Sequence, residues 1–519
     1  MKARSFFITV LLPALFVGAA SVLAFAPFGL WPVQIVTLAV AFRLILKQTS
    51  IRRSVLVGWS YSFGWSVCGI HWLYISMHRY GELPGWMAAA AVALLAAYLA
   101  LFTAGAMAAA AWLRQRWTLR DAVMLTAVFP PLWMLSEWLR GWVLTGFSWS
   151  SSGYAHTTGP LAGYAPLVGV YGIGWMAALL AGCIAMPKNR RALACATLLV
   201  AGGFGLTVIP WTHPHGHPVS VRLLQGNVEQ EMKFAPEQIS NQLDLYYDLI
   251  RSAPADLIAT PETAVPLMTN QLPPDYLSRL SDTARRSNSY LAVGIPINDG
   301  GGHYTNSTIG FSPQPPAGTG LPYQYRYDKY HLVPFGEFIP TGFHGFVDMM
   351  RIPLGDFARG AALQQPFAVK DQWVLPNICY EDLFGEEIAD RLAASHFSGG
   401  PQATILLNMS NIGWFGDSIA LPQHLQISQM RALETGRPML RSTNTGATAY
   451  IDAHGKVVAR LPAFQGGVLS ANVQGYAGIT PYILGGNVAV VALALACLGV
   501  TGFLARRNRM KPPAGPENR

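Results

Sequence analysis

Three side chains in the second half of the sequence could together make and break an acyl bond. Cys379, in the stretch ICYED, carries a thiol that becomes a nucleophile when it loses its proton. Glu262, in TPETAVP, follows the apolar run DLIA, where partial burial should raise the pKa of a carboxylate toward that of a general base. Lys329, in YRYDKYHLVPFGEF, has an ammonium group that could stabilise an oxyanion or lower the pKa of a nearby thiol.

Each of these residues also has an ordinary structural explanation. Glu262 could cap a helix, Lys329 could be a solvated surface lysine, and Cys379 could be buried and inert. Glu337, in the same polar and aromatic run as Lys329, is either a second buried acid or a surface acid. The residue types alone therefore leave the site open.

The immediate neighbours of the cysteine bear on its reactivity. Two acids follow Tyr380 in ICYED, and negative charge beside a thiol raises its pKa and weakens it as a nucleophile. Strand alternation places Tyr380 on the opposite face and Glu381 one step nearer the turn. We therefore expect Glu381 to orient the pocket, and backbone N–H groups near Tyr380 to hold an oxyanion.

Residues 212–480 alternate between short β-rich apolar segments and amphipathic segments. The predicted strands are 220–228, 255–264, 290–297, 372–381 and 403–411, followed by antiparallel strands within 438–461 that turn at DAHG. The predicted helices are 242–251, 274–287, 384–396 and 421–434. This order predicts an α/β layered domain whose strand ends carry the three candidate catalytic residues.

The rest of the chain is strongly apolar. Hydrophobic residues make up 51% of the 519 residues and charged residues 12%, about half of the roughly 25% usual in soluble domains. A membrane-spanning helix needs about 20 mostly apolar residues. Eight stretches qualify: 6–25, 30–46, 54–77, 85–112, 121–138, 161–186, 192–211 and 482–505. We predict a polytopic α-helical membrane protein with eight transmembrane helices, the first retained and not cleaved as a signal peptide.

Basic residues cluster in alternate connections between these spans. They precede span one, lie between spans two and three, four and five, and six and seven, and follow span eight. By the positive-inside rule both termini are cytoplasmic and the α/β domain is extracytoplasmic. The predicted parts are a seven-helix domain at 1–211, the catalytic domain at 212–480, the eighth helix at 481–505 and a basic tail at 506–519. These loops explain much of the net charge of +9, so no nucleic-acid partner is predicted.

The sequence gives little support for a metal or a disulfide. Cys379 is the only one of five cysteines outside the predicted spans. His213, His215 and His217 alternate, as metal ligands on one face of an extended chain would. The Pro and Gly content of WTHPHGHP favours a linker instead, and we predict no metal and no cofactor.

The motifs PET, YDKYHLVPFGE and ICYED, in that order, resemble the nitrilase, or carbon–nitrogen hydrolase, superfamily. The resemblance implies an αββα sandwich with a Glu–Lys–Cys triad. Carried over, it makes Glu262 the general base, Lys329 the transition-state stabiliser and Cys379 the nucleophile. Glu337 matches a further acid near the site of that superfamily.

A nitrilase-like domain between the seventh and eighth spans resembles the apolipoprotein N-acyltransferases, bacterial enzymes that finish lipoprotein maturation. Supporting motifs are LAFAPFGLWP, TGFSWSSSGYAHTTGPLAGYAPLVGVYG, LLQGNVEQEMKF, LLNMSNIGWFGDS and MRALETGRPMLRSTNTG. The resemblance implies transfer of the sn-1 acyl chain of a phospholipid, phosphatidylethanolamine, to Cys379. The thioester then passes the chain to the α-amino group of the S-diacylglyceryl cysteine of an apolipoprotein. It implies a multi-pass inner-membrane protein with a periplasmic catalytic domain, and we expect a monomer.

Both implied substrates are held in the membrane, so aromatic and apolar residues near the site are candidate lipid contacts. Phe234 stands where relatives often have Trp, and Arg140 could meet a lipid phosphate. The remaining candidates lie in an apolar loop at 338–357 and in NIGWFGDS: Phe346, Met349, Trp414 and Phe415. A hydrophobic flap packed on its own domain explains the loop equally well.

Two other functions stay open at the level of the sequence. A membrane-tethered amidase would use the same triad with water as the second nucleophile. A receptor or transporter carrying an inactive nitrilase fold would tolerate changes at Glu262, Lys329 and Cys379. The retention of all three residues favours an enzyme, and the eight spans favour a lipid substrate.

Overall fold

The computed structural model describes residues 2–233, 235–314, 322–340, 342, 345 and 357–510. The chain forms two compact units. We call the first the helical unit, which comprises Met1–His71, Ala90–Ile209 and Asn487–Arg519. The second, the sandwich unit, comprises Trp72–Ala89 and Pro210–Gly486.

The helical unit is built from apolar helices, which satisfy their backbone hydrogen bonds internally as a membrane requires. Its elements are α1 (Lys2–Phe6), η1 (Phe7–Leu11), α2 (Leu12–Ala20), η2 (Ser21–Ala24), α3 (Trp31–Leu46), α4 (Ile51–Ile70), α6 (Gly85–Trp117), α7 (Asp121–Val123), η4 (Met124–Val128), α8 (Phe129–Arg140), η5 (Val143–Thr145), η6 (Ser152–His156), η7 (Pro160–Tyr164), α9 (Ala165–Ile184), α10 (Arg190–Leu206) and α16 (Pro481–Met510). The first residues of α6 and α16 belong to the sandwich unit.

Within the described part of the chain, five helices are long and apolar enough to cross a membrane. They are Arg4–Ala24, Gly85–Trp117, Asp121–Arg140, Pro160–Ile184 and Pro481–Asn508. Trp31–Leu46 is apolar but shorter. The other two predicted spans correspond to α4 and α10, which are helical but fall outside this set. The count of eight therefore stays a prediction.

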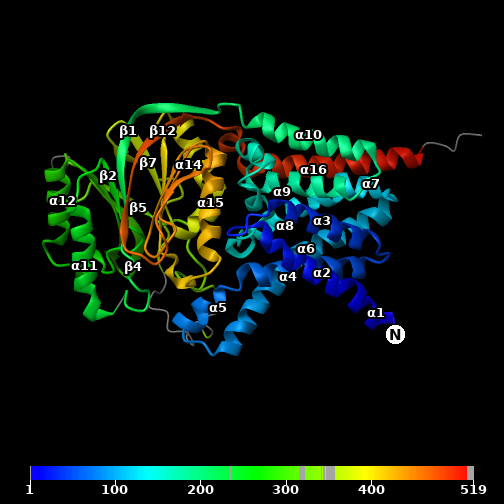
Figure 1. The fold of residues 1–519 in the computed structure, drawn as a ribbon, viewed down its shortest axis with the longest axis horizontal. Helices are drawn as coiled ribbons and strands as arrows, with labels where there is room; N and C mark the ends of the chain where they lie inside the picture. Colours follow the sequence, from blue (N-terminus) through cyan, green and yellow to red (C-terminus); the bar gives the residue numbers. More distant parts are fainter. Residues whose placement is uncertain are drawn as a thin grey trace, which may run out of the picture. The chain divides into compact units, whose positions relative to one another are not determined.

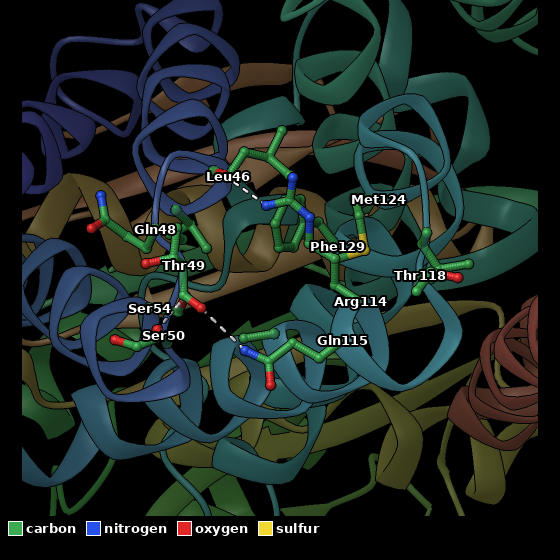
Figure 2. A pocket seen from close by; sticks show the side chains of 13 residues that line it. Leu46, Gln48, Thr49, Ser50, Ser54, Arg114, Gln115, Thr118, Met124 and Phe129 are labelled. Atoms are coloured by element: carbon green, nitrogen blue, oxygen red, sulfur yellow. Dashed lines mark hydrogen bonds between the residues drawn. The ribbon is translucent and has the colours of Figure 1, made fainter.

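A cavity of about 450 Å³ lies in the helical unit, between the connection that precedes α4 and the C-terminal part of α6 (Figure 2). Arg114 donates to the backbone carbonyl of Leu46 at 2.6 Å, and Gln115 donates to that of Thr49 at 3.2 Å. Its lining residues include none of the predicted site residues and no nucleophile with a neighbouring base. The chemistry has to be sought in the sandwich unit.

Among the described residues, the sandwich unit has two six-stranded sheets, ordered β12-β1-β2-β3-β4-β5 and β11-β10-β9-β8-β7-β6. The strands are β1 (Thr212–Gln225), β2 (Leu257–Ala259), β3 (Tyr290–Gly300), β4 (His303–Phe311), β5 (Tyr325–Asp328), β6 (Phe367–Val369), β7 (Gln372–Ile378), β8 (Ile405–Ser410), β9 (Met439–Thr443), β10 (Ala449–Ile451), β11 (Val457–Arg460) and β12 (Gly467–Gly478). In each sheet three neighbouring strands are parallel, namely β1-β2-β3 and β7-β8-β9, and the flanking pairs are antiparallel.

Helices cover the outer face of each sheet, which gives the four layers of an αββα sandwich (Figure 1). The helices are α11 (Pro236–Arg251) and α12 (Tyr276–Ser287) on the first sheet, and α14 (Gly385–Ser398) and α15 (Ala420–Thr435) on the second. A buried cluster joins the inner faces and includes Val221, Leu223, Ala259, Val374, Leu407 and Leu440. Strands buried on both faces are apolar throughout, as the sequence indicates. The predicted α/β layers are confirmed.

The predicted linker at 211–218 is wrong, because β1 already begins at Thr212. Residues 212–215 pair antiparallel with β12, and the register shifts between His215 and Val219. Only residues 221–223 of β1 also pair with β2. Among the described residues this first part of the strand pairs with β12 alone, and prolines without an N–H are tolerated on such an edge strand. The described residues contain no group of three or more His, Cys, Asp or Glu side chains that could hold a metal.

The third predicted span, 54–77, extends too far. Helix α4 ends at Ile70, and the chain then enters the sandwich unit through α5 (Leu73–Ile75) and η3 (Ser76–Tyr80). Trp72 is 1% exposed, although its hydropathy fits a membrane helix equally well. Apolarity alone cannot separate a span from a segment buried in a neighbouring domain, which explains the error.

Candidate active site

The three candidate catalytic residues follow the ends of three strands in the sandwich unit. Glu262 follows β2, Lys329 directly follows β5, and Cys379 directly follows β7. The first two strands belong to one sheet and β7 belongs to the other. The site therefore depends on the packing of the two sheets.

Lys329 links two buried carboxylates. Its Nζ lies 3.2 Å from Oε1 of Glu262 and 2.9 Å from the carboxylate of Glu337. Asn306, in β4, donates from Nδ2 to Oε1 of Glu262 at 2.8 Å and to Oε1 of Glu337 at 2.7 Å. Lys329 is 1% exposed. The surface-lysine interpretation is excluded, and Glu337 is the second buried acid.

The electrostatics correct one expectation. Burial by itself would raise the pKa of Glu262, but the ammonium groups of Lys329 and Lys233 outweigh it and hold the pKa below its usual range. Burial likewise opposes the charge of Lys329, and the two carboxylates reverse that effect and raise its pKa. The expected upward shift of the Glu262 pKa is wrong. The lysines that lower this pKa come from distant parts of the sequence, so the residues around Glu262 did not reveal them. Both groups are charged at neutral pH.

Cys379 stands at a sharp turn between β7 and the 3₁₀ turn η9 (Cys379–Leu383). Its φ is +52°, a backbone conformation that a side chain with Cβ rarely adopts. The predicted strand 372–381 therefore ends earlier, at Ile378, but Cys379 stands at a strand-to-helix turn, as expected. Such a turn presents a side chain at the top of a sheet.

The thiol is protonated at rest. Burial raises the pKa of Cys379 well above its usual value, the Glu262 carboxylate raises it further, and Lys329 opposes both. A thiol in this state needs a base to take its proton during attack. Glu262 is ionised and interacts with the thiol, so it suits that task.

The two acids after Tyr380 are engaged elsewhere. Glu381 accepts hydrogen bonds from the Tyr327 hydroxyl at 2.8 Å and from the backbone N–H groups of Tyr330, His331 and Ile378 at 2.7, 3.2 and 2.6 Å. It thus joins the end of β7 to the segment after β5. The carboxylate is held by these donors and does not stand free beside the thiol.

A second buried network lies under the cysteine. Nε2 of His424 lies 3.2 Å from the backbone carbonyl oxygen of Cys379, and Nδ1 of His424 lies 2.8 Å from Nη2 of Arg441. Arg441 in turn pairs with Asp382 at 3.2 Å. Because Arg441 can only donate, Nδ1 must accept and Nε2 must donate to the carbonyl. Burial lowers the pKa of His424 well below its ordinary value, and the charge of Arg441 lowers it further.

The remaining predicted contacts lie in several places. Tyr380 is buried in the sandwich unit, and Arg140, in the helical unit, donates to Ser151 at 3.1 Å. Trp414 and Phe415, in η10 (Ile412–Phe415), contact Tyr80 and Trp72 at ring-centroid distances of 5.7 and 4.3 Å. The other candidates, Phe234, Phe346 and Met349, lie outside the described residues.

Sequence reasoning missed three residues of the site. Asn306 bridges the two acids, Asn411 donates its backbone N–H to Oε2 of Glu262 at 2.9 Å, and Lys233 donates from Nζ to the backbone carbonyl of Glu262 at 3.1 Å. Lys233 and Asn411 fall inside quoted motifs, LLQGNVEQEMKF and LLNMSNIGWFGDS. A lysine next to apolar residues and an asparagine at a strand end were the available signals.

The sandwich and its Glu–Lys–Cys cluster define a carbon–nitrogen hydrolase-type domain, and the "Carbon-nitrogen hydrolase" family model matches residues 220–482. The "Apolipoprotein N-acyltransferase N-terminal domain" model matches residues 17–183. The chain belongs to the apolipoprotein N-acyltransferase family.

Relatives match over nearly the whole chain. An apolipoprotein N-acyltransferase of Ralstonia nicotianae is 49% identical over 96% of this chain and 93% of its own length. One of Bordetella bronchiseptica is 45% identical over 96% of both chains. Among solved structures, an amidase from Nesterenkonia sp. is 17% identical, covering 55% of this chain and 98% of that one, with a TM-score of 0.38.

Proposed function

We propose that this chain N-acylates apolipoproteins in the bacterial inner membrane, with a phospholipid as acyl donor. Family membership over nearly the full length supports the reaction class. The observation that carries the mechanism is the buried contact of Lys329 with two carboxylates beside Cys379. In the proposal, phosphatidylethanolamine donates its sn-1 acyl chain and the S-diacylglyceryl cysteine of an apolipoprotein receives it.

In the first half-reaction, Glu262 takes the thiol proton while the sulfur of Cys379 attacks the ester carbonyl. Lys329 and backbone N–H groups near Tyr380 stabilise the oxyanion. The tetrahedral intermediate collapses, the ester C–O bond breaks, and Glu262 returns the proton to the leaving lysophospholipid oxygen. A thioester remains on Cys379.

In the second half-reaction, the α-amino group of the acceptor attacks the thioester carbonyl. Glu262 accepts the proton that the nitrogen loses, the C–S bond breaks, and the thiolate takes the proton back. The product is an amide, and the enzyme returns to its resting protonation state. Each half-reaction thus uses the same base and the same oxyanion stabiliser.

The proposal also covers placement in the membrane. It includes eight spans, cytoplasmic termini and a periplasmic catalytic domain. It also includes the domain limits predicted at 211/212, 480/481 and 505/506. It further includes a monomeric state and lipid contacts by Arg140, Trp414, Phe415, Phe234, Phe346 and Met349. The positive-inside pattern supports the orientation.

A product balance tests the reaction class. Purified full-length protein is incubated with phospholipid and a diacylglyceryl-cysteine peptide. We expect lysophospholipid and N-acyl peptide in equal amounts, with both lost in Cys379→Ala and retained in Cys497→Ala, a cysteine of α16. Free fatty acid in place of N-acyl peptide would instead show that water takes the acyl chain, as in a hydrolase, and would contradict the transfer.

A further inference from the structure

A second lysine lies inside the active site, on the connection between β1 and α11. Lys233 is 2% exposed, and its Nζ donates to the backbone carbonyl of Glu262 at 3.1 Å. Its Nζ thus reaches Glu262, the residue proposed as the base. No chemical role for a cation at this position follows from the triad.

The connection that carries Lys233 is anchored to the rest of the site. The N–H of Asn227 donates to the carbonyl of Asn444 at 2.8 Å, and that of Val228 to the side chain of Asn444 at 3.0 Å. Further along, the side chain of Asn411 donates to Gln230 at 2.8 Å. These contacts hold the connection against the ends of β8 and β9, and Asn411 at the end of β8 also binds Glu262. Lys233 is therefore fixed in place.

The charges of the site balance only when Lys233 is counted. Glu262 and Glu337 are two buried carboxylates, and the ammonium of Lys329 contacts both. Lys233 interacts electrostatically with Glu262 and with Cys379. With both lysines charged, the resting cluster of two acids, two lysines and a neutral thiol has no net charge.

We propose that Lys233 is the second cation of the active site, which offsets negative charge as it moves from the Glu262 carboxylate to the sulfur of Cys379. The inference rests on the proposed roles of these two residues as base and nucleophile. When the thiol proton passes to Glu262, the negative charge moves from the carboxylate to the sulfur. Lys233 interacts with both groups. Because the site is buried, the ammonium of Lys233 stabilises the thiolate that forms on Cys379 and offsets the charge that Glu262 no longer carries.

The groups around Lys233 define what its removal should do. It faces Glu262 and Cys379, with Lys329 and Glu337 behind them, while Glu229 and Glu231 on its own connection are exposed. Burial lowers the pKa of Lys233 to about 8, and the charges of Glu262 and Cys379 act against that shift. Removing the charge should therefore make the thiolate of Cys379 harder to form.

Alkylation of the thiol tests this without any acyl donor or acceptor, so the result does not depend on the proposed reaction. The full-length protein is purified with alanine in place of its four other cysteines, Cys68, Cys183, Cys195 and Cys497. Modification of Cys379 by iodoacetamide is followed by mass spectrometry across a pH series. The variants are Lys233→Met, Lys233→Gln and Lys233→Arg, with the exposed Lys456→Met as the matched control.

We expect alkylation near neutral pH to slow about 10-fold or more in Lys233→Met and Lys233→Gln, with the pH midpoint moved upward by about one unit. Lys233→Arg and Lys456→Met should stay near the parent rate. Gln keeps a donor for the Glu262 carbonyl but lacks the charge, so it separates the two roles. Parent-like alkylation in Lys233→Gln would overturn the cation role, and thermal unfolding identifies any variant that has lost its fold.

Discussion

The cysteine and its neighbours show that the charges acting on a thiol cannot be read from the residues beside it in the sequence. Cys379 precedes two acids within three residues, which should weaken it. In the fold, Glu381 is held by four hydrogen-bond donors from other residues and Asp382 is paired with Arg441. The charges that act on the thiol come instead from Glu262 and Lys329.

Replacing Glu381 should therefore disturb the site through its geometry. Glu381→Ala leaves the buried N–H groups of Tyr330 and Ile378 without their acceptor, at about 1–3 kcal/mol each. We expect lower thermal stability and a fall of at least about 10-fold in thioester formation, because small displacements of catalytic groups are costly. Glu237→Gln, at an exposed position in α11, is the control. Full activity in Glu381→Ala would remove Glu381 from the site.

The depressed pKa of Glu262 predicts the acid side of the pH profile. The base must be ionised to accept the thiol proton, and Lys329 and Lys233 keep it ionised against burial. Thioester formation should thus persist below the usual pKa of glutamate and fade only as the pH drops through the depressed value. The same group stabilises the fold above its unfolded-state pKa, and that contribution disappears over the same acid range.

Lys329→Met tests this assignment. It removes the strongest influence that lowers the pKa of Glu262, so the acid limb of the rate profile should move to higher pH. The maximal rate should also fall about 100-fold or more, because the oxyanion loses its cation. The measurement is the rate of thioester formation from pH 4 upward. An unmoved acid limb would show that Lys329 does not act on Glu262.

Among the secondary-structure elements, α15 and β9 support the turn that carries Cys379. His424 from α15 and Arg441 from β9 form a chain of hydrogen bonds that ends on the carbonyl of Cys379. Asn408 from β8 contacts the same carbonyl at 3.4 Å. A residue with positive φ persists only where its surroundings determine it. We infer that His424 positions the nucleophile.

Substitutions at His424 can separate support of the turn from general packing. His424→Leu fills similar space but has no donor for the Cys379 carbonyl, so thioester formation should fall about 10- to 100-fold. His424→Gln can donate to that carbonyl and should recover part of the rate. Equal losses in both variants, with equal stability, would mean that the hydrogen bond has no positioning role.

At the scale of the whole molecule, the alternation of strands and helices was enough to predict the layered α/β domain. The order of the motifs was enough to predict the Glu–Lys–Cys cluster. Asn306, Lys233 and the support from His424 were not predicted, because their contacts join segments at least 29 residues apart and, unlike the triad, the family resemblance gave them no role. Residues 72–77 were assigned to a membrane span because burial in a domain and in a bilayer select the same apolar residues.

The proposed orientation makes a prediction of its own. In a cysteine-free background, Lys456→Cys in the sandwich unit should react with a membrane-impermeant maleimide in spheroplasts. Arg506→Cys, after the last predicted span, should react only once the membrane is opened. These outcomes follow from the basic connections on alternate sides. The reverse labelling pattern would invert the topology.

The most direct test of the central claim is whether Cys379 carries the acyl chain. Purified full-length protein is incubated with phospholipid in the absence of acceptor and its intact mass is measured. The account predicts a gain of one acyl chain that hydroxylamine removes, and no gain in Cys379→Ala. An unmodified wild-type protein, or an adduct that persists in Cys379→Ala, would contradict it.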